Sequence, residues 1–372
     1  MSDRNTLICT VGTSLFSNIA QPNQAELKAL LEQAQRNDHW DALVAKLREL
    51  DPLARVLGAE INSIEDTYKR KFSDLRHLYF LVSDTEAGKQ TGKLLKAYYE
   101  LRSMDGSLPL ETVEHIVIEK LQDAEPIDFK RHGLRNLVRK AGAIINGRTP
   151  QTVVINATGG YKAQIAIAVV LGQALEIPVL YRHEQFSEII DFPPMPISFD
   201  YRLLGENAAL LSAFERGEAF AASEIDDIDD KLRVLLEEVD VDGEMMYELS
   251  AVGQIFLLGF RERVRKPSEL APVSAEAKLP PTFRDDHYPI GFKEFVEKVC
   301  RETGWIKTAH SLPYHNQKSI KGIGFYVRKG KLIGTYVDKD RFGARFEVLT
   351  NASSDEAFAW AADQLNQTYS QG

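Results

Sequence analysis

The sequence predicts an α/β domain with a parallel sheet, then a helical, winged-helix-like module, and finally a small α+β domain. Three observations lead to this order. Over about the first 200 residues, short β-branched runs alternate with longer amphipathic stretches, which is typical of a parallel sheet covered by helices. From Asn207 to Arg265 the composition turns helical and acidic, and after a stretch rich in Pro and Ala it becomes strand-like and basic. A chain of 372 residues is long enough for two or three domains.

The α/β domain is predicted from five strand-like runs, each followed by a helical pattern. They are residues 7–11, 77–82, 113–118, 152–156 and 179–182. The prolines in 193–196 cannot continue a helix and lead into 197–204, so we expect the sheet to end there in an antiparallel edge. We therefore place the first boundary near Leu203, with the α/β domain at 1–203.

The remaining chain is predicted to hold two small domains and a linker. Residues 204–266 read as helices, the last of which starts at the N-cap Ser250, and resemble a winged-helix module. Residues 267–286 lack apolar periodicity and read as a linker. In 287–372 we expect a helix at 292–301, a hairpin turning at Lys329-Gly330, a strand at 344–350 and a helix at 355–369.

Bulk properties exclude several classes of protein. No apolar run approaches the roughly 18 residues of a membrane span, and residues 1–6 lack the features of a signal peptide. Cys9 and Cys300 are too few for a disulfide framework or a metal cluster, so we expect a cytoplasmic protein without a metal. The net charge of −9 excludes a protein that coats nucleic acid with its whole surface.

The most specific motif is NATGGYKAQ at 156–164, where a buried strand meets a helix through a Gly-Gly turn. Glycines let the backbone approach a ligand, the helix start offers unpaired amides, and Lys162 adds positive charge. The first strand runs into Gly12, Thr13 and Ser14, at the sheet edge where open α/β sheets bind ligands. A third loop, 83–93, also follows a strand and adds hydroxyls. The pattern predicts a site for phosphodiesters.

Two common nucleotide motifs are missing from the sequence. No G-x-G-x-x-G follows the first strand, which disfavours a nicotinamide cofactor, and no G-x-x-x-x-G-K-[ST] occurs. Instead, V-G-T-S after the first strand together with N-A-T-G-G-Y-K-A after the fourth resembles the CARF (CRISPR-associated Rossmann fold) family over roughly 1–203.

The resemblance implies a Rossmann-like homodimer whose paired crevices bind a cyclic oligoadenylate made by a type III CRISPR complex. The ring implied is cyclic tetra-adenylate (cA4), with the hexa-adenylate open, and some CARF domains also cleave their ligand. No cofactor besides this activator is implied. The ligand contacts carried over are Gly12, Thr13, Ser14, Ser83, Asp84, Thr85, Asn156, Thr158, Gly159, Gly160, Tyr161 and Lys162.

The C-terminal domain concentrates positive charge. Between Arg301 and Thr350 there are ten Lys and Arg against four acidic residues, so this window is +6 and the rest of the chain is −15. Basic residues alternate with aromatic ones there, as on surfaces that bind RNA phosphates and exposed bases. An HEPN ribonuclease is disfavoured because Arg301 and His310 are too far apart for its Arg-His motif, and FEVL lacks the lysine of a restriction-type nuclease.

The size, element order and basicity of this domain resemble RelE-type ribonucleases, a fold known in fusion with CARF through a winged-helix segment. The resemblance implies metal-independent cleavage of mRNA on the ribosome by 2′-OH attack. Lys or Arg side chains would neutralise the phosphate charge. Tyr336 or His315 would lie near the proton transfers of the 2′-OH attack. The catalytic candidates are Lys318, Lys321, Arg328, Tyr336, Arg341 and Arg345.

Three functions remain open at this point. The first is a ligand-activated endoribonuclease, and the second is a ligand-responsive transcription regulator in which the winged-helix module binds DNA. The third is a ring nuclease that degrades the oligoadenylate. A DNA-reading helix needs basic residues, and residues 204–266 have them only near their end, amid negative charge, so the ribonuclease is favoured.

Overall fold

The computed structural model describes residues 4–71, 74–183, 188–225, 230–284, 287–313 and 323–369. The chain forms two compact units. The first comprises Met1–Ile197 and Ser250–Glu262, and the second comprises Ser198–Leu249 and Arg263–Gly372. The predicted division at residues 203, 266 and 286 is finer than this and stays a prediction.

The first unit is built on a six-stranded sheet in the order β3-β2-β1-β4-β5-β6. Its first five strands are parallel and β6 runs antiparallel to β5. The strands are β1 (Thr6–Thr10), β2 (His77–Ser83), β3 (Thr112–Ile118), β4 (Val153–Asn156), β5 (Val179–Tyr181) and β6 (Ile190–Phe192). The prediction of a Rossmann-like α/β domain is confirmed, and the five predicted strands match to within one residue at each end.

The antiparallel edge is confirmed, but its predicted position was wrong. It is formed by Ile190–Phe192, upstream of the prolines, while the stretch after them enters α9 (Tyr201–Glu206). The β-branched and aromatic run before Pro193 pairs with β5, and proline lacks the N–H that would continue the ladder.

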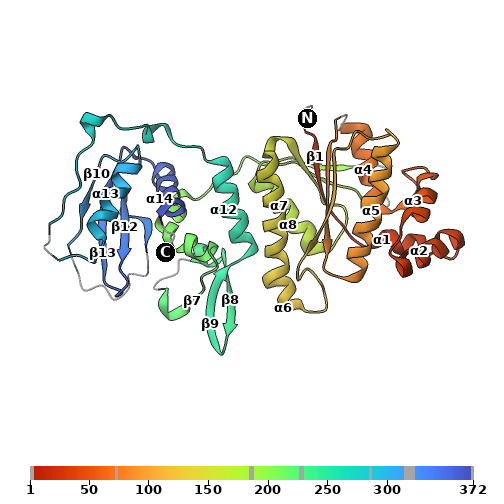
Figure 1. The fold of residues 1–372 in the computed structure, drawn as a ribbon, viewed down its shortest axis with the longest axis horizontal. Coiled ribbons are helices and arrows are strands. Elements are labelled where there is room, and N and C mark those ends of the chain that lie inside the picture. The colour runs from red at the N-terminus through yellow and green to blue at the C-terminus, as the bar shows by residue number, and fades with distance from the viewer. Residues whose placement is uncertain are drawn as a thin grey trace. The chain divides into compact units, whose positions relative to one another are not determined.

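Helices cover both faces of this sheet, so β1 and β2 are buried along their whole length. Figure 1 shows α7 and α8 on one side and α4 and α5 on the other. The helices of the unit are α1 (Ser14–Ile19), α2 (Ala25–Asn37), α3 (Asp41–Arg48), α4 (Gly58–Lys71), α5 (Glu86–Met104), α6 (Pro126–Asp128), α7 (Leu134–Arg148), α8 (Lys162–Ala174) and most of α12 (Ala251–Arg263). Short turns η1 (Arg55–Leu57), η2 (Phe129–Gly133) and η3 (Pro150–Thr152) connect them.

The helix α12 packs with the first unit, although the sequence placed it in the middle module. Its buried Ala251 and Ile255 join the core formed by α7, α8 and the sheet, and Gly142 lies against Leu258. The predicted N-cap is confirmed, because Ser250 Oγ accepts from the Gly253 amide at 3.1 Å.

The middle segment is less helical than predicted. It holds α9, α10 (Ala208–Glu215), α11 (Asp230–Arg233) and a three-stranded sheet in the order β7-β9-β8. These strands are β7 (Phe220–Ala221), β8 (Leu236–Val241) and β9 (Glu244–Leu249), with η4 (Ala222–Glu224) after β7. The prediction that residues 204–266 are helical was wrong over 236–249, where β8 and β9 pair through a hairpin turn at Asp242-Gly243, two residues with positive φ.

The C-terminal part has a four-stranded antiparallel sheet in the order β10-β13-β12-β11. Its elements are α13 (Phe292–Glu302), β10 (Thr308–Ser311), β11 (Gly324–Arg328), β12 (Lys331–Val337), β13 (Gly343–Leu349) and α14 (Asp355–Tyr369). The predicted hairpin at Lys329-Gly330 is confirmed, with φ of 51° and 69°. Strand β10 was not predicted.

The helices α13 and α14 cover the same face of this sheet. Phe295 of α13 and Tyr369 of α14 both contact Phe325 of β11, and they contact each other with ring centroids 6.2 Å apart. Residues that alternate with the core positions of the strands therefore lie on the face that α13 and α14 do not cover, which we call the helix-free face with reference to these two helices. It includes Arg345 and Glu347, which alternate with the buried Phe346 and Val348.

The predicted linker packs against this domain. It contains η5 (Ser268–Leu270) and η6 (Ala275–Ala277), and Leu270 is fully buried in the C-terminal core. The amides of Leu279 and Thr282 donate to the carbonyls of Lys307 and Ala309, both at 2.9 Å. Its low periodicity reflects a segment that follows a sheet edge without forming a regular strand.

Candidate functional site

The two glycine-containing loops meet where the sheet order reverses. Strand β1 pairs with β2 on one side and with β4 on the other, so the loops after β1 and β4 leave the carboxyl edge side by side. In open α/β sheets this crevice is the place where ligands bind.

The loops approach each other so closely that only glycine fits. A Cβ on Gly12 would lie 2.9 Å from the amide nitrogen of Gly160, and a Cβ on Gly159 would lie 2.8 Å from that of Gly12. Gly160 also has a φ of +100°, which side chains with a Cβ rarely adopt. Thr10 Oγ1 donates to the Gly159 carbonyl at 2.6 Å and ties the two loops together.

A buried carboxylate holds the first loop in place. Glu60 of α4 is 2% exposed, and its Oε1 accepts from the Gly12 amide at 3.0 Å while Oε2 accepts from Ser14 Oγ at 3.1 Å. A Cβ on Gly159 would clash with the same carboxylate. Sequence reasoning missed Glu60, because no motif connects a residue of a helical insertion with loops far away in the chain.

These loops line a pocket of about 280 Å³. Six of the predicted ligand contacts line it, namely Gly12, Thr13, Ser14, Thr158, Gly159 and Gly160. The structure adds Ala59, Glu60, Tyr181, Arg182 and His183. The main cation added is Arg182, the last residue of the predicted fifth strand, which in the structure directly follows β5 and so lies at the same carboxyl edge.

Arg182 is fixed from several sides. Its backbone amide donates to Thr158 Oγ1 at 3.1 Å, one guanidinium nitrogen donates to the Asn62 carbonyl at 3.0 Å, and the same nitrogen lies 3.6 Å from Asp66 Oδ2. The side chains of Arg182 and Asp66 are 12% and 4% exposed. A guanidinium has further N–H donors beyond these, so Arg182 can bind an anion without leaving its position.

Asn156 supports the pocket from beneath and does not line it. It is buried, its Nδ2 donates to Ser63 Oγ at 2.8 Å, and its Oδ1 accepts from Thr158 Oγ1 at 2.6 Å. This chain of hydrogen bonds joins α4 to β4 and orients Thr158.

Tyr161 and Lys162 follow the Gly-Gly turn but lie outside the pocket lining. The Tyr161 hydroxyl donates to Asp123 Oδ1 at 3.3 Å, and its ring packs edge-to-face on Phe129. Burial raises the pKa of Tyr161. Lys162 is exposed at the first position of α8, where its flexible side chain is two residues away from Gly160.

The third predicted loop mainly caps α5. Thr85 Oγ1 accepts from the Gly88 amide at 3.0 Å and lies 2.9 Å from Ser83 Oγ. Asp84 pairs with Lys89 at 2.8 Å and accepts from the Lys120 amide at 3.1 Å. The hydrogen bond from Lys89 holds the pKa of Asp84 below its usual range. The polar atoms of this loop are thus engaged within the protein.

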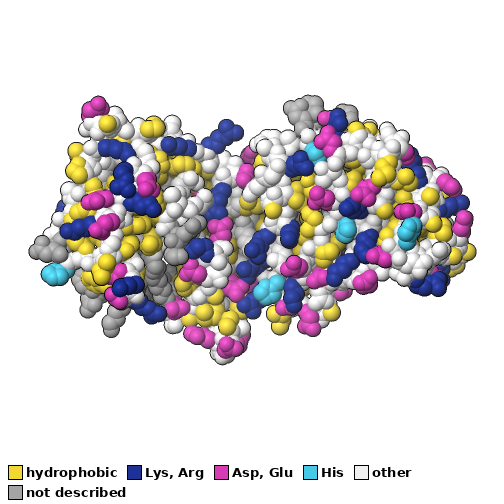
Figure 2. All heavy atoms as spheres, viewed as in Figure 1, with side chains coloured by type: hydrophobic (Ala, Val, Ile, Leu, Met, Phe, Trp, Pro, Cys, Tyr) yellow, Lys and Arg dark blue, Asp and Glu magenta, His cyan; other side chains and the backbone are white. Residues whose placement is uncertain are grey.

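A basic stretch that sequence reasoning missed also starts near this edge. Residues 129–175 contain seven Lys and Arg and no acidic residue. They begin with η2, after β3, and run through α7, over which Figure 2 shows Lys and Arg side chains gathered. This stretch gives the first unit a positive face within a chain whose net charge is −9.

The predicted catalytic residues of the C-terminal domain do not all converge. Arg328 pairs with Lys331 at the start of the seven-residue β12, whereas Arg341 lies beyond its other end, and β12 spans about 20 Å. Tyr336 lies on the helix-covered face, packs on Phe292 and donates to the Ile290 carbonyl at 2.8 Å. Lys318, Lys321 and His315 lie outside the described residues.

Arg345 shares the helix-free face with other polar side chains. His310 of β10 is paired with Glu347, which accepts from Lys331 Nζ at 2.9 Å, and Arg345 is paired with Thr335. The Nε of Arg345 is buried and has no hydrogen-bond partner among the described residues. A buried N–H group without an acceptor calls for an explanation, and an anionic ligand would supply one.

Within the described residues, no group of three or more His, Cys, Asp or Glu is arranged to hold a metal ion. No described helix combines the length and the apolar character needed to cross a bilayer.

Comparisons with known proteins point to one family. Residues 55–195 match the family described as CRISPR-associated protein (Cas_APE2256), and no curated protein matches the chain. Among solved structures, the chain is similar to Can2 from Sulfobacillus thermosulfidooxidans in complex with cyclic tetra-adenylate, with 9% identity and a TM-score of 0.25. The match covers 70% of this chain and 63% of that chain, which is less than two thirds of its length. From η1 to the segment after β6, which includes Glu60, the Gly-Gly turn and Arg182, this chain is therefore similar to a CRISPR-associated family.

Proposed function

We propose that the first unit is a CARF-type sensor of cyclic oligoadenylate, with cA4 as the preferred ring. The observation that carries this is the pocket between the two glycine loops, with Arg182 fixed in its wall. Close backbone approach, hydroxyls and a held guanidinium are what a phosphodiester requires. The similarity of residues 55–195 to a CRISPR-associated family supports the same assignment.

The size of the pocket supports a homodimer. Pockets for drug-sized ligands measure about 300 to 1,000 Å³, and a ring of four nucleotides is larger than such ligands. The pocket of one chain, at about 280 Å³, takes only part of the ring. Two copies related by a two-fold axis would present two such pockets to a two-fold symmetric ligand.

Calorimetry with cA4, cyclic hexa-adenylate and linear tetra-adenylate tests the sensor. We expect the cyclic ligands to bind with one ring per two chains and cA4 to bind most tightly. Lys162→Ala should weaken cA4 binding by about 1.5 to 3 kcal/mol, the cost of a lost charged hydrogen bond. Unchanged affinity would remove Lys162 from the site, and the absence of binding by any cyclic oligoadenylate would overturn the proposal.

One contact favours a second function of the same pocket. Ser14 Oγ donates to the Glu60 carboxylate at the pocket wall, so a hydroxyl and a base lie next to a site for phosphodiesters. This arrangement would suit slow cleavage of the bound ring. Incubating the protein with cA4 and separating the products by chromatography tests it, because linear products in the wild type and their loss in Ser14→Ala are expected.

We propose that the second unit carries the effector, an RNA-cleaving domain of RelE type that acts on ribosome-bound mRNA. Its support is the positive charge of residues 301–350 and the buried, unsatisfied Nε of Arg345 on the helix-free face. A translation assay with and without cA4 tests this activity. Inhibition only in the presence of the ligand is expected, together with cleaved mRNA.

The alternative of a DNA-binding regulator is opposed by the charge of the middle segment. Its β8–β9 hairpin would be the wing of a winged-helix DNA reader, but residues 236–249 hold six acidic residues and no basic one. A wing of this charge repels the phosphate backbone. Loss of RNA cleavage together with specific duplex DNA binding would favour the regulator instead.

A further inference from the structure

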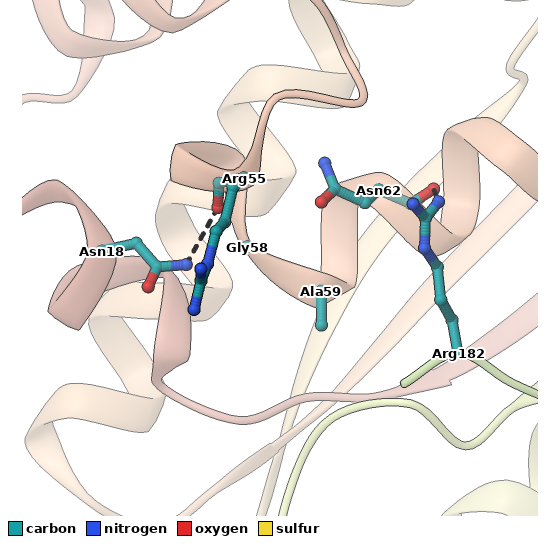
Figure 3. A pocket seen from close by; sticks show the side chains of 6 residues that line it. All are labelled: Asn18, Arg55, Gly58, Ala59, Asn62 and Arg182. Carbon is teal, nitrogen blue, oxygen red and sulfur yellow. Dashed lines mark hydrogen bonds between the residues drawn. The ribbon is translucent and has the colours of Figure 1, made fainter. Parts of the chain in front are cut away.

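A second hollow adjoins the glycine-loop pocket. It is lined by Asn18, Arg55, Gly58, Ala59, Asn62 and Arg182. Figure 3 shows Asn18 and Arg55 on one side, Asn62 and Arg182 on the other, and Ala59 between them. Ala59 and Arg182 line both hollows, so the two are continuous along the first turn of α4.

The charged donors that line this hollow are the guanidinium groups of Arg55 and Arg182. Asn62 is occupied, because its Nδ2 donates to the carbonyls of Pro52 and Ala54 at 2.8 and 3.1 Å. Asn18 Nδ2 uses one of its two N–H groups to donate to the Arg55 carbonyl at 3.0 Å, which leaves one neutral donor beside the two guanidinium groups.

The two arginines differ in how they are held. Arg182 is nearly buried and braced by Asn62 and Asp66, whereas the Arg55 side chain is exposed and no described residue pairs with its guanidinium. A short turn and Gly58, with φ of +74°, hold the backbone of Arg55 directly before α4. The start of this 14-residue helix adds amides without intrahelical acceptors and the positive end of its dipole.

We propose that this hollow is a second phosphate subsite, in which Arg55 and Arg182 bind the phosphate next to the one held by the glycine loops. This inference rests on the proposed sensor function and extends its site onto the helical insertion between β1 and β2. The hollow, at about 10 Å³, has room for about one water molecule, so Arg55 must swing outward and close again on the bound phosphate. An exposed side chain can do this without disturbing the core.

The test compares Arg55→Ala with Arg36→Ala in calorimetric titrations with cA4. Both arginines are exposed and belong to the same unit, but Arg36 lies on α2 and donates to its own helix at Glu32. We expect Arg55→Ala to weaken cA4 binding about 10- to 100-fold, as for a lost charged hydrogen bond, and Arg36→Ala to leave it unchanged. Arg55→Lys should fall between, because it keeps the charge but loses the bidentate geometry.

The outcomes separate the two proposals. If the wild-type protein binds no cyclic oligoadenylate, the sensor function itself fails. If the wild type binds cA4 and Arg55→Ala binds within twofold of Arg36→Ala, the sensor stands and the second subsite is wrong. Arg182→Lys, checked for folding by circular dichroism, provides the second variant, and we expect it to weaken binding by at least as much as Arg55→Lys.

Discussion

At the scale of single residues, the shape of the pocket depends on glycines in the loops after β1 and β4, because a Cβ at these positions would not fit. The sequence predicts that Gly159 and Gly160 let the backbone approach a ligand, and this stays a prediction. In the structure the space that a Cβ on Gly159 would need is taken by Gly12 and Glu60. The residues that surround these glycines could be predicted only in part. Gly12 followed from its position after the first strand, but Glu60 and Arg182 reach the site through tertiary packing that no local pattern encodes.

Gly159→Ala should damage both stability and ligand binding. The new Cβ would lie 2.8 Å from the Gly12 amide nitrogen and clash with Glu60, so the two loops must separate. We expect a loss of about 1 to 3 kcal/mol in the free energy of unfolding, as for other overpacked sites, and cA4 affinity reduced at least tenfold. Urea denaturation and calorimetry measure these two quantities.

Gly147→Ala is the matched control for this change. Gly147 lies in α7, and a Cβ there meets nothing within 4 Å. Because alanine favours helix over glycine by about 1 kcal/mol, this variant should be as stable as the wild type or more so, with unchanged affinity. Equal behaviour of the two variants would contradict the tight packing of the loops.

Asp84→Asn should lower stability in a pH-dependent way. Lys89 holds the pKa of Asp84 below its ordinary value of 3.8, so the folded state binds this proton less readily than the unfolded state. The stabilisation is therefore complete above the unfolded pKa and is lost as the pH falls through the lower, folded pKa. Urea denaturation should show wild type more stable by about 0.2 to 1 kcal/mol at pH 7, and this gap should narrow below pH 4. A gap that stays constant from pH 7 to pH 3 would exclude the ion pair as its cause.

At the scale of secondary structure, the apolar periodicity of the sequence predicted the buried strands and the closing helix. Glycine at a turn predicted the hairpin. The five parallel strands are short runs rich in apolar and β-branched residues, α14 has a clear apolar period, and the Lys329-Gly330 hairpin has a glycine at its turn. The hairpin at Asp242-Gly243 was missed because its strands are mostly acidic and exposed, which resembled a polar helix. Strand β10 has only four residues, and its pairing with β13 depends on long-range register.

A substitution at Thr85 tests whether this residue serves as the N-cap of α5. Its Oγ1 caps α5, so Thr85→Ala should cost about 0.5 to 2 kcal/mol in the free energy of unfolding, while Thr85→Ser should restore most of it. If capping is its task, cA4 affinity measured on the folded variant should stay within about threefold of wild type. A large loss of affinity without a loss of stability would instead support the direct ligand contact that the family resemblance implies.

At the scale of the whole molecule, the two sites differ in how far a sequence can reveal them. The sensor loops are contiguous motifs, so their residues could be named in advance and six of them line the pocket. The effector residues are single side chains whose convergence depends on strand register. Register places Arg345 on the helix-free face with His310 and Glu347, and it sets Arg328 and Arg341 far apart.

Replacing Arg328, Arg341 and Arg345 together with Ala should abolish RNA cleavage. The affinity for cA4 should change by no more than the coupling free energy between the two sites. Without a metal, fixed cations must stabilise the charge that develops at phosphorus, and each well-placed donor contributes about 2.7 to 4 kcal/mol. The single variants should differ. The Nε of Arg345 is buried and has no partner in the part of the chain that the structure describes, whereas Arg341 is an exposed turn residue. We therefore expect Arg345→Ala to lower the cleavage rate by about 100-fold or more and Arg341→Ala by less than tenfold.

Single-turnover cleavage of a defined mRNA on ribosomes measures the rates, and calorimetry with cA4 checks the sensor in the same preparations. Coupling between distant sites is typically about 1 to 3 kcal/mol, so the affinity for cA4 should change by no more than this. Two results would each redirect the assignment. Near wild-type RNA cleavage by the triple variant would show that these three arginines are not the catalytic groups and would move the active centre away from this basic face. A larger defect in Arg341→Ala than in Arg345→Ala would move it from the helix-free face to the turn between β12 and β13.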